Sequence, residues 1–103
     1  MGTRVSELDI FPEEYRTDIE HALEILREGG CREVHVFGSV AEGRTRLGSD
    51  IDLAVRGCPP RHFFKLLGRL LMQLDHPVDL VDLDREPRLA SFLEKHGLLI
   101  HVE

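Results

Sequence analysis

The residues best suited to chemistry are two aspartates one residue apart, Asp50 and Asp52. In a strand that begins at Asp50, both carboxylates point to one face of the sheet, because side chains alternate between faces. Ile51 and Leu53 then point to the other face, into the core. Two ionised carboxylates this close repel each other, and a divalent cation such as Mg2+ offsets the repulsion. The pair therefore predicts a metal site.

A glycine-serine turn lies upstream of the aspartates. Gly38 and Ser39 follow the apolar-rich run 33–37, which is typical of a strand. Glycine lets the backbone approach a ligand closely, the Ser39 hydroxyl can bond a phosphate oxygen, and amides at the start of a helix favour negative charge. Most dipeptides of this kind are ordinary turns, but next to the aspartate pair this one predicts a phosphate site.

Together these residues resemble the minimal nucleotidyltransferases of the DNA polymerase beta superfamily. The matching residues are the turn Gly38-Ser39, then Gly43, then the run Ser49-Asp50-Ile51-Asp52 that opens the next strand. The resemblance implies a third carboxylate on a later strand, where Asp79 is flanked by aliphatic residues. It also implies an α+β fold, in which residues 1–103 form a single small polymerase beta-like domain with a mixed four-stranded sheet and helices packed on one face.

The resemblance further implies a two-metal mechanism with ATP as donor. Asp50, Asp52 and Asp79 are expected to be catalytic and to hold two Mg2+ ions. The expected nucleotide-binding residues are Gly38, Ser39, Ser49 and Arg44. Ser49 should also order the turn before the strand by bonding backbone, and Arg46 shares the loop with Arg44. Many relatives carry an arginine where this chain has Glu42, so no phosphate contact is expected from that position.

Small stand-alone members of this family are commonly encoded beside helical HEPN partners and act as antitoxins. The resemblance therefore implies transfer of a nucleoside monophosphate, AMP from ATP, onto a hydroxyl of such a partner, a tyrosine. Two alternatives stay open: a non-catalytic module that neutralises a partner by contact, and transfer to a small-molecule hydroxyl. Homo- or hetero-oligomers are also open, with Phe63, Phe64 and the segment 98–102 as candidate apolar contacts.

Composition narrows the classes of partner and location. A net charge of -6 argues against a nucleic-acid partner, which normally requires a basic surface. No apolar run approaches the roughly 20 residues of a membrane span, and nothing resembles a signal peptide, so a cytoplasmic location is expected. Cys31 and Cys58 lack zinc-site spacing and are expected to be free thiols.

The remaining pattern predicts the elements that position the site. The apolar spacing of residues 12–28 predicts a helix, which Gly29 and Gly30 terminate. The expected order then continues with a strand over 33–37, a short helix over 40–43, a strand over 50–55, a helix over 61–74, a strand over 78–83, a helix over 87–96 and a strand over 98–102.

Other polar residues are expected to play structural roles. The six histidines, His21, His35, His62, His76, His96 and His101, show no clustered ligand spacing along the chain. Asp82 and Asp84 have the opposite parity to Asp79 in a regular strand, so they should face away from it.

Overall fold

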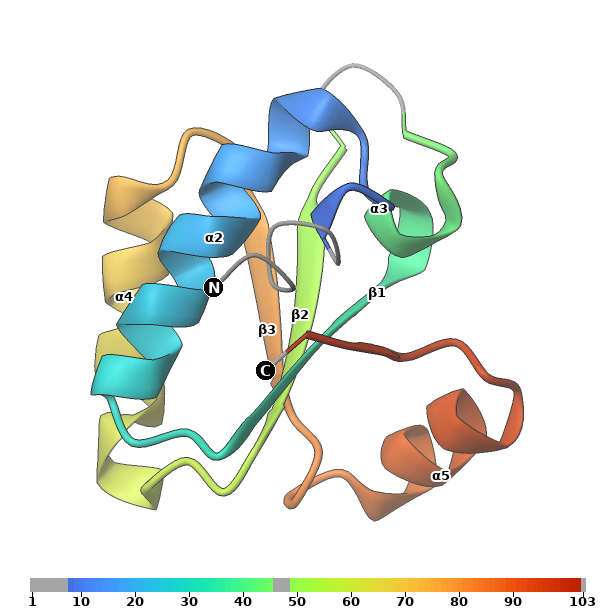
Figure 1. The fold of residues 1–103 in the computed structure, drawn as a ribbon. Coiled ribbons are helices and arrows are strands. Elements are labelled where there is room, and N and C mark those ends of the chain that lie inside the picture. Colours follow the sequence, from blue (N-terminus) through green and yellow to red (C-terminus); the bar gives the residue numbers. More distant parts are fainter. Residues whose placement is uncertain (1–7, 46–48, 103) are drawn as a thin grey trace.

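The computed structural model describes residues 8–45 and 49–102 (Figure 1). The elements are α2 (Glu13–Glu28), β1 (Glu33–Phe37), α3 (Gly38–Glu42), β2 (Ile51–Arg56), η1 (Pro60–His62), α4 (Phe63–Gln73), β3 (Val78–Asp82), α5 (Pro87–Lys95) and β4 (Ile100–His101). Each predicted helix and strand is present, with boundaries shifted by at most two residues.

The four strands form one mixed sheet in the order β3-β2-β1-β4. β1 runs antiparallel to both β2 and β4, whereas β2 and β3 are parallel. A parallel pair needs a crossover connection, and α4 supplies it between β2 and β3. This arrangement confirms the predicted α+β class and the mixed four-stranded sheet.

The main core lies between the sheet and the two long helices, α2 and α4, which cover one face (Figure 1). Ile51, Leu53 and Val55 of β2 are fully buried there. The apolar stripe of α2 packs against them, which confirms the face predicted from its helical spacing. The odd-numbered positions of β2 therefore belong to the core, and the even-numbered positions point to the other face.

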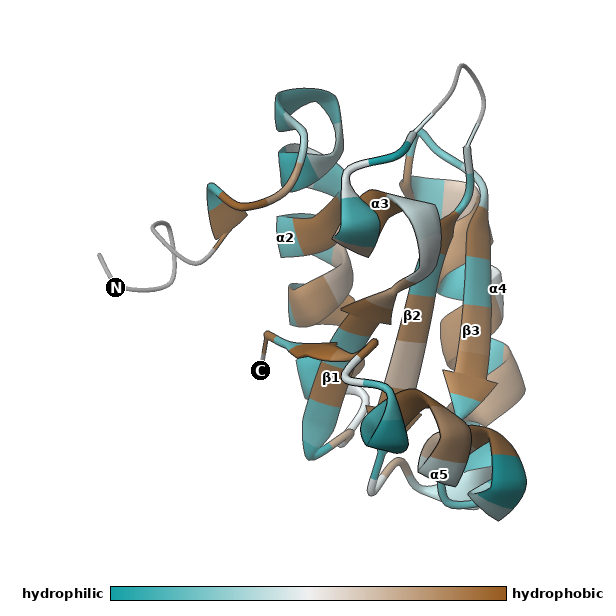
Figure 2. Ribbon diagram, turned by 90° about the vertical axis from the view of Figure 1, so that its right-hand side faces the viewer, coloured by the Kyte–Doolittle hydropathy of each residue, from teal (hydrophilic) through white to brown (hydrophobic). Residues whose placement is uncertain are grey.

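The last helix, α5, adds a smaller cluster that includes residues of the opposite face of the sheet. Its Ala90 and Leu93 pack with Ala54 of β2, and Phe37 and Val81 lie against the same cluster. Figure 2 shows α5 at the end of the sheet away from α3. Among the described residues, no helix covers this face at the ends of β2 and β3 that lie beside α3. The predicted site residues Asp52 and Asp79 lie in this part of the sheet, each near the first residue of its strand.

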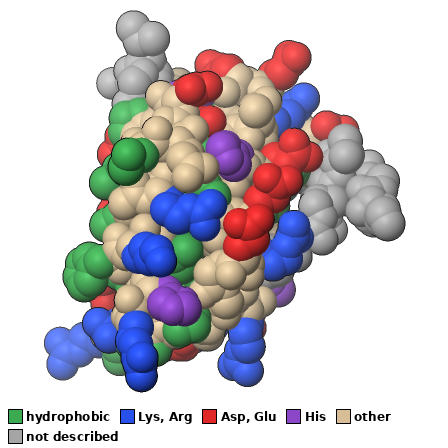
Figure 3. Space-filling model, turned by 90° about the vertical axis from the view of Figure 1, so that its left-hand side faces the viewer, with side chains coloured by type: hydrophobic (Ala, Val, Ile, Leu, Met, Phe, Trp, Pro, Cys, Tyr) green, Lys and Arg blue, Asp and Glu red, His purple; other side chains and the backbone are tan. Residues whose placement is uncertain are grey.

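α4 buries only part of its apolar surface. Leu66 and Leu70 enter the core, and Phe63 packs against it, but Phe64 is 74 % exposed and Met72 is 86 % exposed. Figure 3 shows hydrophobic side chains along one edge of this face of the molecule, with basic groups beside them and a row of acidic groups farther across. The candidate contact Phe64 is thus at the surface, whereas Phe63 is partly buried against the core.

A buried aspartate joins α2 to the loop that leads into β3. The carboxylate of Asp18 accepts hydrogen bonds from the backbone amides of Asp75 and His76 and, at 2.7 Å, from Nδ1 of His76. Burial alone would raise the pKa of Asp18, but the hydrogen bonds from the His76 side chain and the two amides together lower that pKa. This contact fixes the loop that sets the start of β3.

The two cysteines form a disulfide, Cys31–Cys58, so the expectation of free thiols was wrong. The physical reason is the pairing of β1 with β2. Glu33 lies opposite Arg56, and continuing the same antiparallel register by two residues brings Cys31 opposite Cys58. The two cysteines are 27 residues apart in the chain, so their proximity depends on the strand register and not on any local spacing.

Reduction of this disulfide is expected to destabilise the protein by roughly 3 kcal/mol, because the bond closes a long loop in the unfolded chain. Urea unfolding with and without dithiothreitol measures the difference. The Cys31→Ser, Cys58→Ser double variant is the control, since its midpoint should not respond to the reductant. Equal midpoints for the oxidised and reduced wild-type protein would contradict the expectation.

None of the helices built from the described residues combines the length and apolar character that a bilayer span requires.

Candidate active site

The two predicted metal ligands of the first motif lie where β2 begins. Asp50 directly precedes β2 and is exposed, and Asp52 is the second residue of the strand and is half-buried. Because Ile51 and Leu53 are fully buried in the main core, Asp52 points to the opposite face of the sheet. The strand alternation predicted from the sequence is confirmed at these positions.

Asp79 lies beside Asp52 on the neighbouring strand. β2 and β3 pair in parallel, and Asp79 is the direct register partner of Asp52. Directly paired residues project to the same face, so Asp79 joins Asp52 on the side away from α2 and α4. Asp82 has the opposite parity and is buried, where its Oδ1 accepts a hydrogen bond from the amide of Asp84. The expectation that Asp82 faces away from Asp79 is confirmed.

The electrostatics of Asp52 reflect its burial and the negative charges of the two neighbouring aspartates. Burial raises the pKa of Asp52 to about 6, with further contributions from the negative charges of Asp79 and Asp50. A carboxylate in such surroundings is more easily protonated than usual, and a cation would favour its ionised form. The three oxygen-bearing side chains fit Mg2+, which prefers carboxylate oxygens.

Gly38 lies directly against this carboxylate. It follows β1, whose last residue Phe37 is the cross-strand partner of Asp52, and it has a φ of +74°. A Cβ at this position would lie 2.1 Å from Oδ2 of Asp52, which is closer than two non-bonded atoms can approach. Glycine is therefore required here both by backbone conformation and by the close approach to Asp52.

The rest of the turn forms the short helix α3. Ser39 is half-buried, and its carbonyl accepts a hydrogen bond from the amide of Arg44 at 2.9 Å. Gly43 ends α3 in the left-handed conformation, with a φ of +72°. The guanidinium of Arg44 pairs with Glu42 and is otherwise exposed, so its predicted phosphate contact stays a prediction.

Ser49 closes the loop that leads to the aspartates, and Arg46 falls outside the described residues. The backbone carbonyl of Ser49 accepts a hydrogen bond from the hydroxyl of Tyr15 at 3.4 Å. The ring of Tyr15 also packs on His76, with ring centroids 4.2 Å apart. Tyr15 therefore supports the approach to both β2 and β3 from the helix α2.

The apolar spacing of residues 12–28 includes Tyr15, but it did not predict that the Tyr15 hydroxyl forms a hydrogen bond. A signal was available, because it is the chain's one tyrosine and lies on a buried stripe, where a hydroxyl needs a hydrogen-bond partner. The identity of that partner depends on the tertiary structure. Tyr15 is a positioning residue, since it contacts the backbone of the loop and not the carboxylates.

The amino-acid sequence matches a known family along most of the chain. Residues 16–103 match the model of the polymerase beta nucleotidyltransferase domain. The chain belongs to this family. It is therefore a nucleotidyltransferase. A comparison with curated protein sequences gave no match.

Solved structures of toxin-antitoxin complexes share this nucleotidyltransferase fold. A chain of a toxin-antitoxin crystal structure with AMP-PNP is 26% identical, with a TM-score of 0.66, over 79% of this chain and 68% of that one. A chain of the toxin-antitoxin MntA-HepT is 22% identical, with a TM-score of 0.64, over 85% of this chain and 71% of that one. A substituted MntA-HpeT complex gives 26% identity and a TM-score of 0.66, over 82% and 70%. The chain thus resembles nucleotidyltransferases of toxin-antitoxin systems.

Proposed function

We propose that the chain is an antitoxin that transfers AMP from ATP onto a tyrosine hydroxyl of a helical HEPN-type partner toxin. The observation that carries the transfer chemistry is the placement of Asp52 on β2 directly beside its register partner Asp79 on β3, with Asp50 just before the strand. The partner class is supported by the likeness to chains of toxin-antitoxin complexes, and the donor by the relative solved with AMP-PNP.

In this mechanism the chain's own residues hold and orient the reactants. Asp50, Asp52 and Asp79 would hold the two Mg2+ ions, and Asp79 would also accept the proton of the attacking hydroxyl. When bound, Mg2+ neutralises charge on the triphosphate and favours the ionised hydroxyl. Gly38 and Ser39 orient the terminal phosphates, with Arg44 and Ser49 at the edges of the same site.

The reaction exchanges one bond to phosphorus for another. The tyrosine oxygen forms a bond to the α-phosphorus of ATP, and the bond from that phosphorus to the oxygen bridging to the β-phosphate breaks. Pyrophosphate leaves with the electron pair of the broken bond, and the hydroxyl proton passes to Asp79. Catalysis then consists mainly of positioning and of compensating negative charge.

We place the single nucleotidyltransferase domain over residues 1–103 and the protein in the cytoplasm, where nucleoside triphosphates are available. Nucleic acid is not a proposed partner, because the net charge of -6 opposes binding to a phosphate backbone. The assembly is a hetero-oligomer with the toxin.

The test incubates the purified chain with α-labelled ATP, Mg2+ and a purified HEPN-type protein encoded beside it. The expected result is labelled partner whose label maps to a tyrosine and disappears with the Asp50→Asn, Asp52→Asn double variant. The control is Glu20→Gln, Glu24→Gln, which removes the same charge from exposed positions of α2 and should retain full transfer. Label on the partner that survives loss of both aspartates would refute the assignment.

A second function, neutralisation by contact alone, is favoured by the exposed apolar side chains of α4, Phe64, Leu71 and Met72. A growth assay with the toxin separates the two functions. Under the transfer mechanism, Asp50→Asn, Asp52→Asn abolishes protection. Under contact neutralisation that variant protects fully, whereas Phe64→Ser, Met72→Ser does not. A small-molecule acceptor would instead give labelled product without labelled protein.

A further inference from the structure

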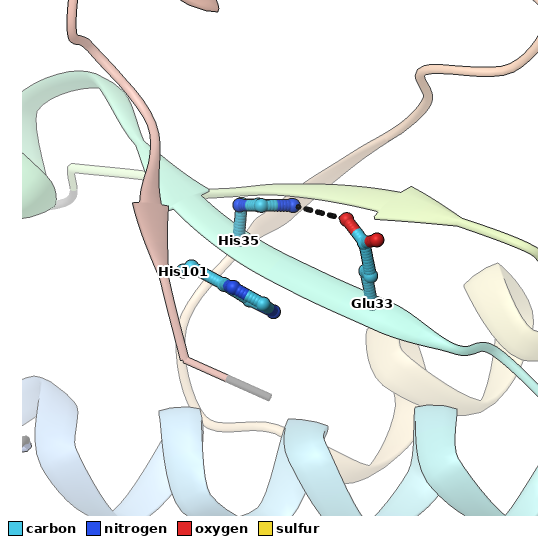
Figure 4. Close-up of side chains that lie close together, drawn as sticks. All are labelled: Glu33, His35 and His101. Atoms are coloured by element: carbon cyan, nitrogen blue, oxygen red, sulfur yellow. Dashed lines mark hydrogen bonds and ion pairs between the residues drawn. The ribbon is translucent and has the colours of Figure 1, made fainter.

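Two histidines and a glutamate meet on the strands farthest from β3. Glu33 and His35 lie on β1, two positions apart, so both project to the same face of the sheet. His101 of β4 is the direct register partner of His35 and joins them from the edge strand. Figure 4 shows the three side chains gathered at the β1-β4 pair. Sequence spacing did not reveal this group, because 66 and 68 residues separate His101 from His35 and Glu33 along the chain.

The distances suit shared coordination of one ion. A ligand atom from each of the three side chains lies within 4.8 Å of the other two. Oε1 of Glu33 is 3.2 Å from Nε2 of His35, close to the roughly 3.4 Å expected between two ligands of a tetrahedral metal. The rings of His35 and His101 stack with centroids 4.6 Å apart. Because Glu33 is half-buried and His101 is exposed, both can rotate by the small amount that a common ion requires.

His35 is buried, and its Nε2 is held by a hydrogen bond to Oε1 of Glu33. Burial lowers the pKa of His35, despite the opposing influence of that hydrogen bond. Nδ1 of His35 is buried, and the part of the chain described here offers it no hydrogen-bond partner. Because a carboxylate oxygen accepts hydrogen bonds, Nε2 of His35 donates to Glu33 in the metal-free protein, and Nδ1 is the nitrogen without a proton.

The nearest competing group is the guanidinium of Arg56, which lies across from Glu33 on β2. Its Nε is 3.9 Å from Oε1 of Glu33, whereas its terminal nitrogens pair with Glu94 and, at 3.6 Å, with Asp84. Arg56 is therefore compensated by two carboxylates other than Glu33. If Glu33 turns toward the histidines, Arg56 still has acidic partners.

We propose that Glu33, His35 and His101 form a second metal site, separate from the catalytic aspartates, that binds Zn2+. Two imidazoles and one carboxylate are typical ligands of zinc, with water or another group in the fourth position. The catalytic site offers only carboxylates, which suit Mg2+, so the two sites select different ions. The zinc site joins β4, which has only two residues, to β1 and fixes the C-terminal segment on the sheet.

The test measures Zn2+ binding by equilibrium dialysis against a chromophoric chelator, with Co2+ absorption as a report of imidazole coordination. The wild-type chain and the Asp50→Asn, Asp52→Asn variant are both expected to bind one Zn2+ in the presence of excess Mg2+. His101→Ala and Glu33→Gln should each weaken binding by at least about tenfold. His96→Ala removes an exposed histidine of the α5 terminus and should leave binding unchanged.

Thermal unfolding supplies an independent readout. Zn2+ should raise the Tm of the wild-type chain and of His96→Ala, and the shift should vanish in His101→Ala. His101 is exposed, so its replacement is not expected to unfold the metal-free protein. Equal Zn2+ affinity in the wild type and His101→Ala would overturn the proposal. Loss of binding on removal of the two catalytic aspartates alone would also overturn it, because that result would place the zinc at the catalytic site.

Discussion

Replacement of Asp52 by asparagine is expected to abolish nucleotidyl transfer, with a loss on the order of 1,000-fold or more, while stabilising the metal-free protein at neutral pH. The folded-state pKa of Asp52 is raised to about 6, above its value in the unfolded chain. Protonated Asp52 therefore makes its full contribution to the free energy of unfolding below the pKa of about 3.9 in the unfolded chain. This contribution is lost as the pH rises through about 6. At pH 7.5 the ionised side chain destabilises the fold, by about 1 kcal/mol after solvent screening.

Urea unfolding in EDTA at pH 4 and pH 7.5 measures this effect. Asp52→Asn should gain stability over the wild type at pH 7.5 and lose that advantage at pH 4. Glu20→Gln, an exposed substitution on α2, should show no such difference between the two pH values. A variant that is less stable than the wild type by the same amount at both pH values would contradict the electrostatic explanation.

Substitution of Gly38 by alanine is expected to reduce transfer by about 100-fold and to destabilise the fold by roughly 2–3 kcal/mol. The left-handed backbone at this position accounts for about 1–2 kcal/mol. The remainder comes from the new Cβ, which would lie 2.1 Å from Oδ2 of Asp52 and must push the carboxylate aside. Misplacing a catalytic group by about 1 Å is enough for an activity loss of this size.

Gly43 provides a matched control for this prediction. Its φ of +72° is nearly the same as that of Gly38, but a Cβ built on it meets no atom within 4 Å among the described residues. Gly43→Ala should therefore be destabilised by about 1–2 kcal/mol and keep most of its activity. Initial rates and urea midpoints for both variants separate the two effects. Equal activity losses would show that backbone conformation, and not the contact with Asp52, explains the result at Gly38.

Local patterns were sufficient to predict the helices and strands and the face of β2 on which Asp52 lies. Strand alternation placed Asp52 away from the core, and the buried positions of Ile51 and Leu53 confirm it. The family resemblance implied a third carboxylate at Asp79, whose pairing with Asp52 is a consequence of the parallel register. The prediction for Asp52 succeeded because hydrophobic periodicity decides which face of a strand is buried.

The features that escaped prediction all depend on contacts between distant segments. The Cys31–Cys58 disulfide requires knowledge of the β1-β2 register, and the grouping of His35 with His101 requires the β1-β4 pair. The hydrogen bond between Asp18 and His76 spans 58 residues. Chain spacing carries no record of such contacts, since they are set only when the sheet and helices assemble.

The disulfide and the candidate metal ligand Asp52 lie at opposite ends of one antiparallel ladder. Cys31 and Cys58 mark one end, and Phe37 and Asp52 form the pair at the other. A slip of one residue between the strands would turn Asp52 into the core and would also separate the two sulfur atoms. The disulfide can therefore form only when β1 and β2 are paired in the correct register. A count of free thiols in refolded protein would report the fraction of molecules in which the strands are misaligned and the candidate active site cannot assemble.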